Sequence, residues 1–151
     1  MATTISELTY ELSVRSLTEQ ESSLNELRTR TGVLLAATAV AIALFGSRVL
    51  DDGSLFDLAG TGLALVSFLL SVFVVAPKHS FAFVVDAAAA HETFAREGVS
   101  VEDAHTALVY WNREVWEENQ AVIDTLVRAF RWACVTLVGA VALWSIGLAI
   151  Q

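Results

Sequence analysis

Three long stretches of the chain carry almost no charge, and polar sequence separates them. The first covers residues 31–47, and reaches residue 50 if the side chain of Arg48 extends toward water; the others cover 58–77 and 132–150. A hydrocarbon core about 30 Å thick needs about 20 helical residues, so each stretch can cross a bilayer. Three buried helices of a soluble bundle are the alternative, but soluble helices of this length have a polar face. The pattern predicts transmembrane helices at about 31–50, 58–77 and 132–150.

The polar segment before the first span, residues 1–30, has the periodicity of an amphipathic helix. Thr4 and Glu7 have the spacing of a capping box. No Pro or Gly occurs before Gly32, so we expect this helix to continue into the first span. Its apolar face could pack on neighbouring segments of the same chain or form a coiled coil with another subunit. That face contains Ile5, Leu8 and Leu12, with Val14, Leu17 and Leu24 beside it.

Two further helices are predicted between the second span and the end of the chain. Pro77 and Lys78 mark the end of the second span, and residues 80–96 follow as a helix. Gly98 is expected to close that helix in the left-handed conformation. Ser100 and Asp103 then have capping-box spacing, and nothing interrupts the helical pattern after them. We therefore expect one helix of about 50 residues whose second half is the third span.

The basic residues predict how the chain is oriented. Eight of the nine Lys and Arg residues lie before the first span or between the second and third, and only Arg48 lies between the first two. By the positive-inside rule, the N-terminus is cytosolic and Gln151 is outside. The prediction is an all-α protein of the inner (cytoplasmic) membrane, a single membrane domain over residues 1–151. It comprises a cytosolic helix (1–30), a transmembrane hairpin (31–77), cytosolic helices that form a hairpin (78–131) and a third transmembrane helix (132–151) continuous with the last of them.

Small side chains recur on one face of each predicted span at steps of three and four residues. Such faces let helix backbones approach closely in lipid, so we expect the first two spans to pack tightly as a hairpin. The residues are Gly32, Ala36, Ala39, Ala43 and Gly46 in the first span, Gly60, Ala64, Ser67 and Ser71 in the second, and Ala133, Thr136, Ala140 and Gly147 in the third.

The hydroxyl groups within the spans have a second interpretation. Thr38, Ser67, Ser71 and Thr136 could line a pore between subunits, although such hydroxyls more often bond to carbonyls of their own helix. Apart from Arg48, the spans carry no ionisable Asp, Glu, Lys, Arg or His residue. This argues against a coupled transporter or a proton pump, which needs charges inside the bilayer. A pore gated by a hydrophobic constriction remains compatible with the pattern.

The segment before the third span has an apolar stripe at heptad spacing that contains two asparagines. Asn112 and Asn119 lie seven residues apart in this stripe, and Trp116 widens it. A buried Asn at a seam position fixes register and oligomeric state at a cost in stability. The other two interpretations are that both asparagines point to solvent or to a polar neighbour such as Arg96, and that they contact a ligand. The stripe consists of Leu108, Asn112, Val115, Asn119, Val122, Leu126 and Ala129.

The composition of the chain argues against nucleic-acid binding, internal disulfide formation and zinc binding. The chain has 151 residues, 55% of them hydrophobic, and its formal charge of −8 argues against nucleic-acid binding through clustered basic residues. A single cysteine, Cys134, excludes an internal disulfide. His79, His91 and His105 lie in unrelated local patterns, and Ala95 stands where an HExxH zinc motif needs its second histidine. With no catalytic, metal, cofactor or phosphate-loop motif in the sequence, we expect a protein that is not an enzyme and needs no cofactor.

The run Glu-Leu-Arg-Thr-Arg-Thr-Gly-Val-Leu-Leu-Ala-Ala at 26–37 leads into the first span, and Asn112 and Asn119 precede Arg128 and Trp132. In these residues and in the order of its elements, the chain resembles the small bacterial membrane effectors of the Pycsar and SLATT types. The resemblance implies a cytosolic N-terminal helix, a transmembrane hairpin and then cytosolic helices. It also implies an effector that oligomerises and damages the inner membrane after a nucleotide signal.

We therefore expect a membrane effector or signalling subunit whose cytosolic helices receive a signal and whose spans respond. A scaffolding membrane protein that recruits a cytosolic partner is the second hypothesis, and an oligomeric channel for small solutes is the third. The expected partners are the lipid bilayer, further copies of the chain, and a cytosolic protein or nucleotide signal.

Overall fold

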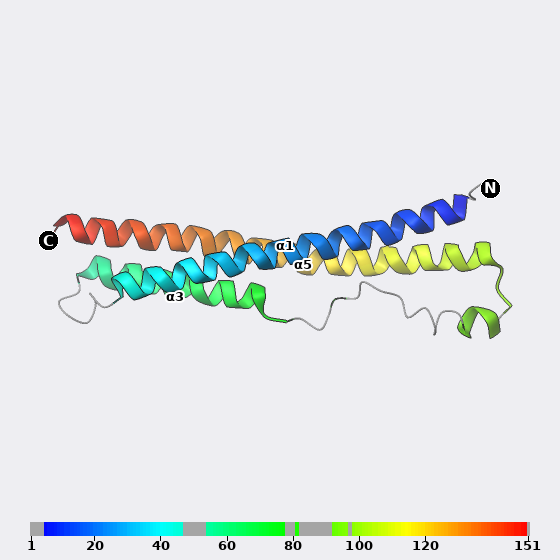
Figure 1. Ribbon diagram of the computed structural model, residues 1–151, viewed down its shortest axis with the longest axis horizontal. Helices are drawn as coiled ribbons and strands as arrows, with labels where there is room; N and C mark the ends of the chain where they lie inside the picture. Colours follow the sequence, from blue (N-terminus) through cyan, green and yellow to red (C-terminus); the bar gives the residue numbers. More distant parts are fainter. Residues whose placement is uncertain (1–4, 47–53, 78–80, 82–91, 97, 151) are drawn as a thin grey trace. The chain divides into compact units, whose positions relative to one another are not determined.

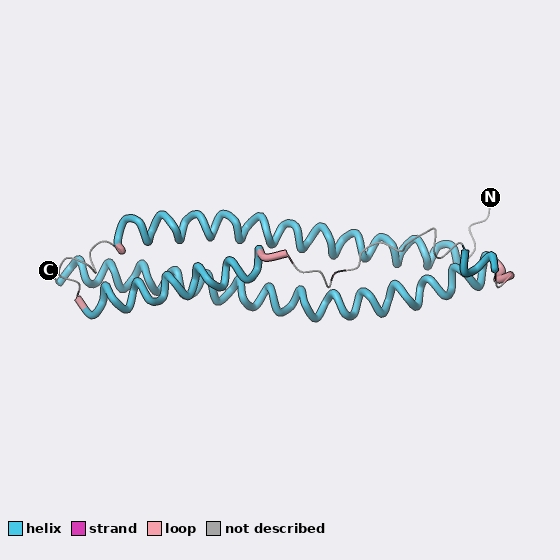
Figure 2. The backbone as a smooth tube through the Cα atoms, turned by 90° about the horizontal axis from the view of Figure 1, so that it is seen from below, coloured by secondary structure: helices cyan, strands magenta, loops and turns pink. Residues whose placement is uncertain are grey.

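The computed structural model describes residues 5–46, 54–77, 81, 92–96 and 98–150. Three helices account for most of them: α1 (Ile5–Phe45), α3 (Leu55–Val75) and α5 (Val101–Ile150). Residues 92–96 are also helical, and no strand occurs within the described ranges (Figure 1 and Figure 2). The all-α class is confirmed, and α1, α3 and α5 are each long and apolar enough to cross a membrane.

The chain forms two compact units, and both α1 and α5 contribute to each of them. The polar unit contains Met1–Asn25 and Lys78–Ile123, and the apolar bundle contains Glu26–Pro77 and Asp124–Gln151. In the polar unit, α1 and α5 run side by side. Tyr10 stacks on His105 and Gln20 bonds to Gln120, so the two helices run in the same direction. In the apolar bundle, α3 packs with α1 and α5.

Two predictions of unbroken helices are confirmed. The N-terminal helix continues into the first apolar stretch, so that α1 has 41 residues. The last helix begins after Ser100 and continues to Ile150, so that α5 has 50 residues. Most of the stability of such helices comes from packing of their faces rather than from intrinsic propensity. The contacts of α1 and α5 in each unit therefore determine how firmly that unit is held.

Local sequence signals determine the turn before α5. Gly98 has a φ of 65°, and the N–H of Val99 donates to the carbonyl of Phe94 at 3.1 Å, which is the closing arrangement predicted for this glycine. The hydroxyl of Ser100 accepts the N–H of Asp103 at 3.2 Å and donates to its carboxylate at 2.7 Å. Ser100 is therefore the N-cap of α5, as predicted.

Replacing Gly98 by Ala should destabilise this turn by about 1 kcal/mol, because an L side chain is strained at positive φ. No atom lies within 4 Å of a Cβ built at this position, so the effect comes from the backbone alone. Gly98→Asn should be less harmful, since Asn tolerates this conformation better. Thermal unfolding in detergent, followed by circular dichroism, measures the difference. Equal stability of wild type and Gly98→Ala would contradict the prediction.

The limits of α3 differ from the span predicted at 58–77. Ser54 is the N-cap: its hydroxyl accepts the N–H of Asp57 at 3.3 Å, and the Asp57 carboxylate accepts the N–H of Ser54 at 3.1 Å. This capping box starts the helix at Leu55. At the other end, Ala76 is extended (φ −53°, ψ 134°), as favoured before a proline, so α3 ends at Val75. Pro77 therefore follows the end of α3.

Some predictions fall outside the described residues. The helix predicted over 80–96 is described only at 81 and 92–96, where residues 92–96 are helical and Phe81, contrary to the prediction, is not. Thr4 of the first capping box, the loop with Arg48, and both His79 and His91 also lie outside the described ranges.

Most apolar side chains of the three helices face outward. In the most apolar window of each helix, only 11% of the residues of α1, 28% of α3 and 22% of α5 are buried. Val33, Leu44, Leu69 and Val138 are each at least 66% exposed. Extended apolar surface of this kind is rare on a protein that faces water. The three helices are therefore compatible with a membrane protein.

Candidate functional site

A row of polar side chains lies between α1 and α5 in the polar unit, and we call it the polar seam. Nδ2 of Asn112 donates to the hydroxyl of Ser13 at 2.7 Å. Further along, Nε2 of Gln20 donates to Oε1 of Gln120 and to the backbone carbonyl of Trp116, each at 3.1 Å. Asn112 and Asn119 are 1% and 2% exposed. Of the three interpretations of these asparagines, exposure to solvent is thus excluded.

Apolar side chains alternate with the polar ones along the seam. Leu17, Leu24 and Val115 are buried there. On α1 the packed positions recur at steps of three and four residues, the heptad spacing of a coiled coil. They are Tyr10, Ser13, Leu17, Gln20 and Leu24, and on α5 they include Asn112, Val115 and Asn119.

Two amide oxygens of the polar seam have no partner among the described residues. Oδ1 of Asn112 and Oε1 of Gln20 are buried and accept no hydrogen bond. A buried carbonyl oxygen without a donor costs about 1–3 kcal/mol. The seam is therefore less stable than an apolar seam of the same length, and a donor that reached either oxygen would stabilise it.

A cavity of about 180 Å³ adjoins Asn112 in the polar unit. Trp116, 38% exposed, supplies an aromatic wall, and the guanidinium of Arg113 is paired with Glu117 at 2.9 Å. An aromatic surface beside hydroxyl and amide groups, with the nearby charge already paired, suits a small polar ligand of low net charge. The cavity is lined by Ser13, Ser16, Val109, Asn112, Arg113 and Trp116.

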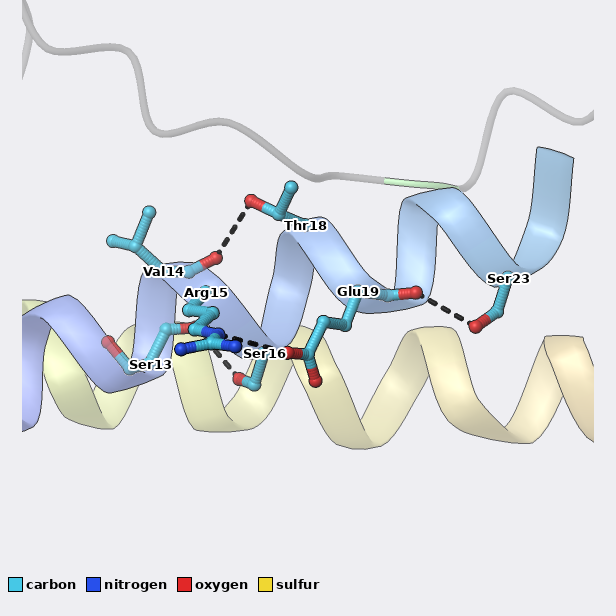
Figure 3. Close-up of polar contacts among 7 residues, drawn as sticks. All are labelled: Ser13, Val14, Arg15, Ser16, Thr18, Glu19 and Ser23. Atoms are coloured by element: carbon cyan, nitrogen blue, oxygen red, sulfur yellow. Dashed lines mark hydrogen bonds and ion pairs between the residues drawn. The ribbon is translucent and has the colours of Figure 1, made fainter.

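Hydroxyl groups of α1 in the polar unit bond back to their own helix. Thr18 donates to the carbonyl of Val14 at 3.1 Å (Figure 3). Ser23 likewise donates to the carbonyl of Glu19 at 2.9 Å, and the Glu19 carboxylate pairs with Arg15 at 3.1 Å. Side chains that bond in this way slightly destabilise a helix. This half of α1 therefore depends on its contacts with α5.

The face predicted to pack in residues 1–30 is buried only in part, because Leu17 and Leu24 lie in the seam whereas the residues nearer the N-terminus do not. Ile5, Leu8 and Leu12 are 83%, 50% and 56% exposed, whereas Ser13 and Gln20 face α5. At this end of the helix the periodicity of hydrophobic residues identified the wrong side, because polar side chains occupy seam positions. The exposed residues form an apolar face without a described partner.

In the apolar bundle, hydroxyl groups connect the three helices. Ser67 of α3 donates to the carbonyl of Ala133 of α5 at 2.8 Å, and its oxygen lies 3.5 Å from the hydroxyl of Thr38 of α1. Ser71 donates to the carbonyl of Ser67 at 2.8 Å. Thr38, Ser67 and Ser71 are fully buried, so their hydroxyl groups face the inside of this bundle. Thr136 donates to carbonyls of its own helix.

Replacing Ser67 by Ala should destabilise the apolar bundle by about 0.6–1.7 kcal/mol, the range for hydrogen bonds between membrane helices. Ser145→Ala is the matched control, because the hydroxyl of Ser145 is exposed and bonds only to the carbonyl of Val141 on its own helix. Unfolding in mixed detergent micelles with increasing sodium dodecyl sulfate compares the two variants. The same loss in both would show that the contact of Ser67 with Ala133 contributes nothing specific.

The small-residue faces of the three helices are used differently. On α3, Gly60, Ala64, Ser67 and Ser71 are all buried. On α5, Ala133, Ala140 and Gly147 are buried and Thr136 is half-buried. On α1, by contrast, Gly32, Ala36, Ala39 and Ala43 are exposed and Gly46 is half-buried.

The hairpin packing predicted through that face of α1 is therefore corrected by the structure. α1 packs through Thr31 and Thr38, which are fully buried. Alanine is so frequent in this stretch that a small-residue spacing fits more than one face, and on the face that packs Thr38 supplies a hydroxyl near Ser67.

An aromatic contact closes the core of the apolar bundle. Trp144 of α5 is 1% exposed and stacks on Phe45 of α1, with ring centroids 5.0 Å apart. Gly60 of α3 lies against the indole, since a Cβ at this position would be 2.9 Å from Cδ1 and Nε1 of Trp144. At Gly147, an added Cβ would lie 3.1 Å from Oδ1 of the buried Asp57. Both glycines thus provide space for a neighbouring side chain.

No group of three His, Cys, Asp or Glu residues that could hold a metal ion occurs in the part of the chain that the structure describes. Comparison of the chain with protein-family models, curated proteins and solved structures finds no match. The polar seam and its cavity are therefore the strongest candidate for a functional site.

Proposed function

We propose that the chain is a non-enzymatic membrane effector or signalling subunit, in which the polar unit receives a cytosolic signal and the apolar bundle responds. The observation that carries this proposal is the continuity of α1 and α5. Each helix belongs to both units and has no break between them. A change in packing of the two helices at the polar seam therefore acts on the same helices that build the apolar bundle.

The composition of the polar seam supports a receiving role. Its unpaired oxygens, on Asn112 and Gln20, lower the stability of the pair. A ligand or protein group that donates to either oxygen would favour one packing of the helices over another, and such differential binding is what shifts a conformational equilibrium. The adjoining cavity of about 180 Å³ offers a place for a small polar ligand of low net charge.

The proposal also places the protein in the inner membrane and assembles it as a homo-oligomer. The distribution of Lys and Arg supports an inner-membrane protein with a cytosolic N-terminus and an external C-terminus. The exposed small-residue face of α1, Gly32, Ala36, Ala39 and Ala43, supports assembly as a homo-oligomer through close helix contacts in lipid. Such an assembly could damage the membrane when the signal arrives.

The decisive experiment is to induce the protein in bacterial cells while the membrane potential is followed with a voltage-sensitive dye. An effector should depolarise the membrane and release dye as the signal is supplied. A variant with Asn112→Leu and Asn119→Leu should respond less at the same level of expression, because an apolar seam holds one packing more firmly. Glu118→Leu, on the exposed side of α5, is the matched control and should respond like wild type. A flat potential under all stimuli would exclude an effector.

A scaffold that recruits a cytosolic partner is the second candidate. The observation in its favour is the exposed apolar face of α1 at Ile5, Leu8 and Leu12. A scaffold should leave the membrane potential unchanged, and should purify with a partner that is lost when residues 1–28 are deleted. A solute channel is a weaker candidate, because Ser67 and Ser71 are engaged inside the bundle.

A further inference from the structure

A second cavity, of about 330 Å³, lies on α5 within the apolar bundle. It is lined by Arg128, Arg131, Trp132 and Val135, which share one face of the helix by their spacing of three, four and seven residues. All four residues are exposed, Trp132 by 63% and Val135 by 59%. From Trp132 to the end of α5 the helix carries no charged residue. The cavity therefore spans the boundary between the charged and the uncharged parts of α5.

The two arginines of this cavity have no carboxylate partner among the described residues. Arg128 donates from Nε to the carbonyl of Asp124 at 3.4 Å and from Nη2 to the hydroxyl of Thr125 at 3.3 Å, and both acceptors are uncharged. Arg131 forms no ion pair with a described residue. Arg15, Arg30 and Arg113, by contrast, each form an ion pair with a Glu one turn away. Two uncompensated positive charges thus adjoin an apolar wall.

We propose that this cavity binds an anionic phospholipid. The phosphate would lie between the two guanidinium groups, which bind phosphate through paired, charge-assisted hydrogen bonds. The acyl chain would lie along Trp132 and Val135, where the surface becomes apolar. Tryptophan is enriched at the level of lipid headgroups, and basic pockets on membrane helices recognise anionic headgroups.

The apolar wall favours a lipid over other anions. An acidic peptide or a free phosphate would satisfy Arg128 and Arg131 but would leave Trp132 and Val135 exposed. A phospholipid combines an anionic headgroup with an apolar chain in the order that the cavity requires. The site is independent of the polar seam and goes beyond the proposed function, since it requires no signal.

Native mass spectrometry of the full chain in detergent tests the proposal. The protein is supplied with equal amounts of phosphatidylglycerol and phosphatidylcholine that have the same acyl chains, and the retained lipid is counted. Wild type should retain about 25 times more phosphatidylglycerol than phosphatidylcholine, because each arginine contributes about a fivefold preference. The variant with Arg128→Gln and Arg131→Gln should lose this preference. A control with Arg15→Gln and Arg30→Gln loses the same charge and should keep it.

Two further measurements separate the lipid from other sources of phosphate. Trp132→Ala should lower the retention of both lipids without changing their ratio. Inorganic phosphate in excess should not release the bound phosphatidylglycerol. Complete release would overturn the proposal, because it would show a phosphate site in which the acyl chain of the lipid has no role. Equal retention of the two lipids by wild type would also overturn it, as would an unchanged preference in the variant lacking Arg128 and Arg131.

Discussion

Gly60→Ala should destabilise the apolar bundle by about 2 kcal/mol, a typical cost of one extra methyl group in a packed core. A Cβ at residue 60 would lie 2.9 Å from the indole of Trp144 and 3.2 Å from the carbonyl oxygen of Ala140. The indole has little room to move, because it is 1% exposed and stacks on Phe45. The added methyl group therefore has to push α3 away from α5.

Gly62 provides the matched control on the same helix. No atom lies within 4 Å of a Cβ built there, so Gly62→Ala adds the same methyl group and the same helix propensity without a contact. Unfolding by sodium dodecyl sulfate in mixed micelles should rank Gly60→Ala below wild type, with Gly62→Ala at least as stable as wild type. If both variants lose the same stability, the close contact of Gly60 with Trp144 does not hold the bundle together.

The second large effect is a gain in stability. Asn112→Leu should stabilise the polar unit by about 1 kcal/mol, because the cost of a buried carbonyl oxygen without a donor, about 1–3 kcal/mol, exceeds the contribution of the hydrogen bond to Ser13, about 0.5–1.5 kcal/mol. Ser13 would not be left without a partner, since its hydroxyl donates to the carbonyl of Tyr10 at 2.7 Å. The adjoining cavity leaves room for the larger side chain.

Hydrogen exchange of backbone amides measures this gain in the polar unit separately from the apolar bundle. Exchange in 5–25 and 101–123 should be slower in Asn112→Leu than in wild type. Glu118→Leu places the same side chain at an exposed position of α5 and should change stability by no more than about 0.5 kcal/mol. Faster exchange in Asn112→Leu would show that the hydrogen bond of Asn112 to Ser13 outweighs the unpaired oxygen.

Together with the depolarisation assay, this measurement tests why the polar seam is polar. A variant that is more stable and also less responsive would show that the seam trades stability for the ability to change its packing. A variant that is more stable and responds normally would place the receiving site elsewhere in the chain.

Signals within a few residues of each other determined much of the secondary structure. Gly98 and Ser100 predicted the turn before α5 correctly, because positive φ and N-cap bonding depend on a single residue and its near neighbours. The start of α3 at Ser54 and Asp57 was missed, although the same capping-box spacing is present there. The span had been predicted to start at residue 58, because the uncharged stretch begins one residue after Asp57. The structure buries this aspartate inside the helix.

The sequence by itself determined the all-α class, the three apolar helices and the continuity of α1 and α5, because helix length and hydrophobicity are properties of a single segment. Only the tertiary structure decided which face of α1 packs, whereas the predicted faces of α3 and α5 are buried as expected. On α1, Thr31 and Thr38 are buried instead of Gly32 and Ala36, and Ser13 instead of Leu12 contacts α5. The physical reason is that apolar residues can face lipid as readily as a neighbouring helix, so that hydrophobicity does not distinguish inside from outside. A buried hydroxyl or amide, in turn, is favourable only where another helix supplies its partner, and that partner is far away in the sequence.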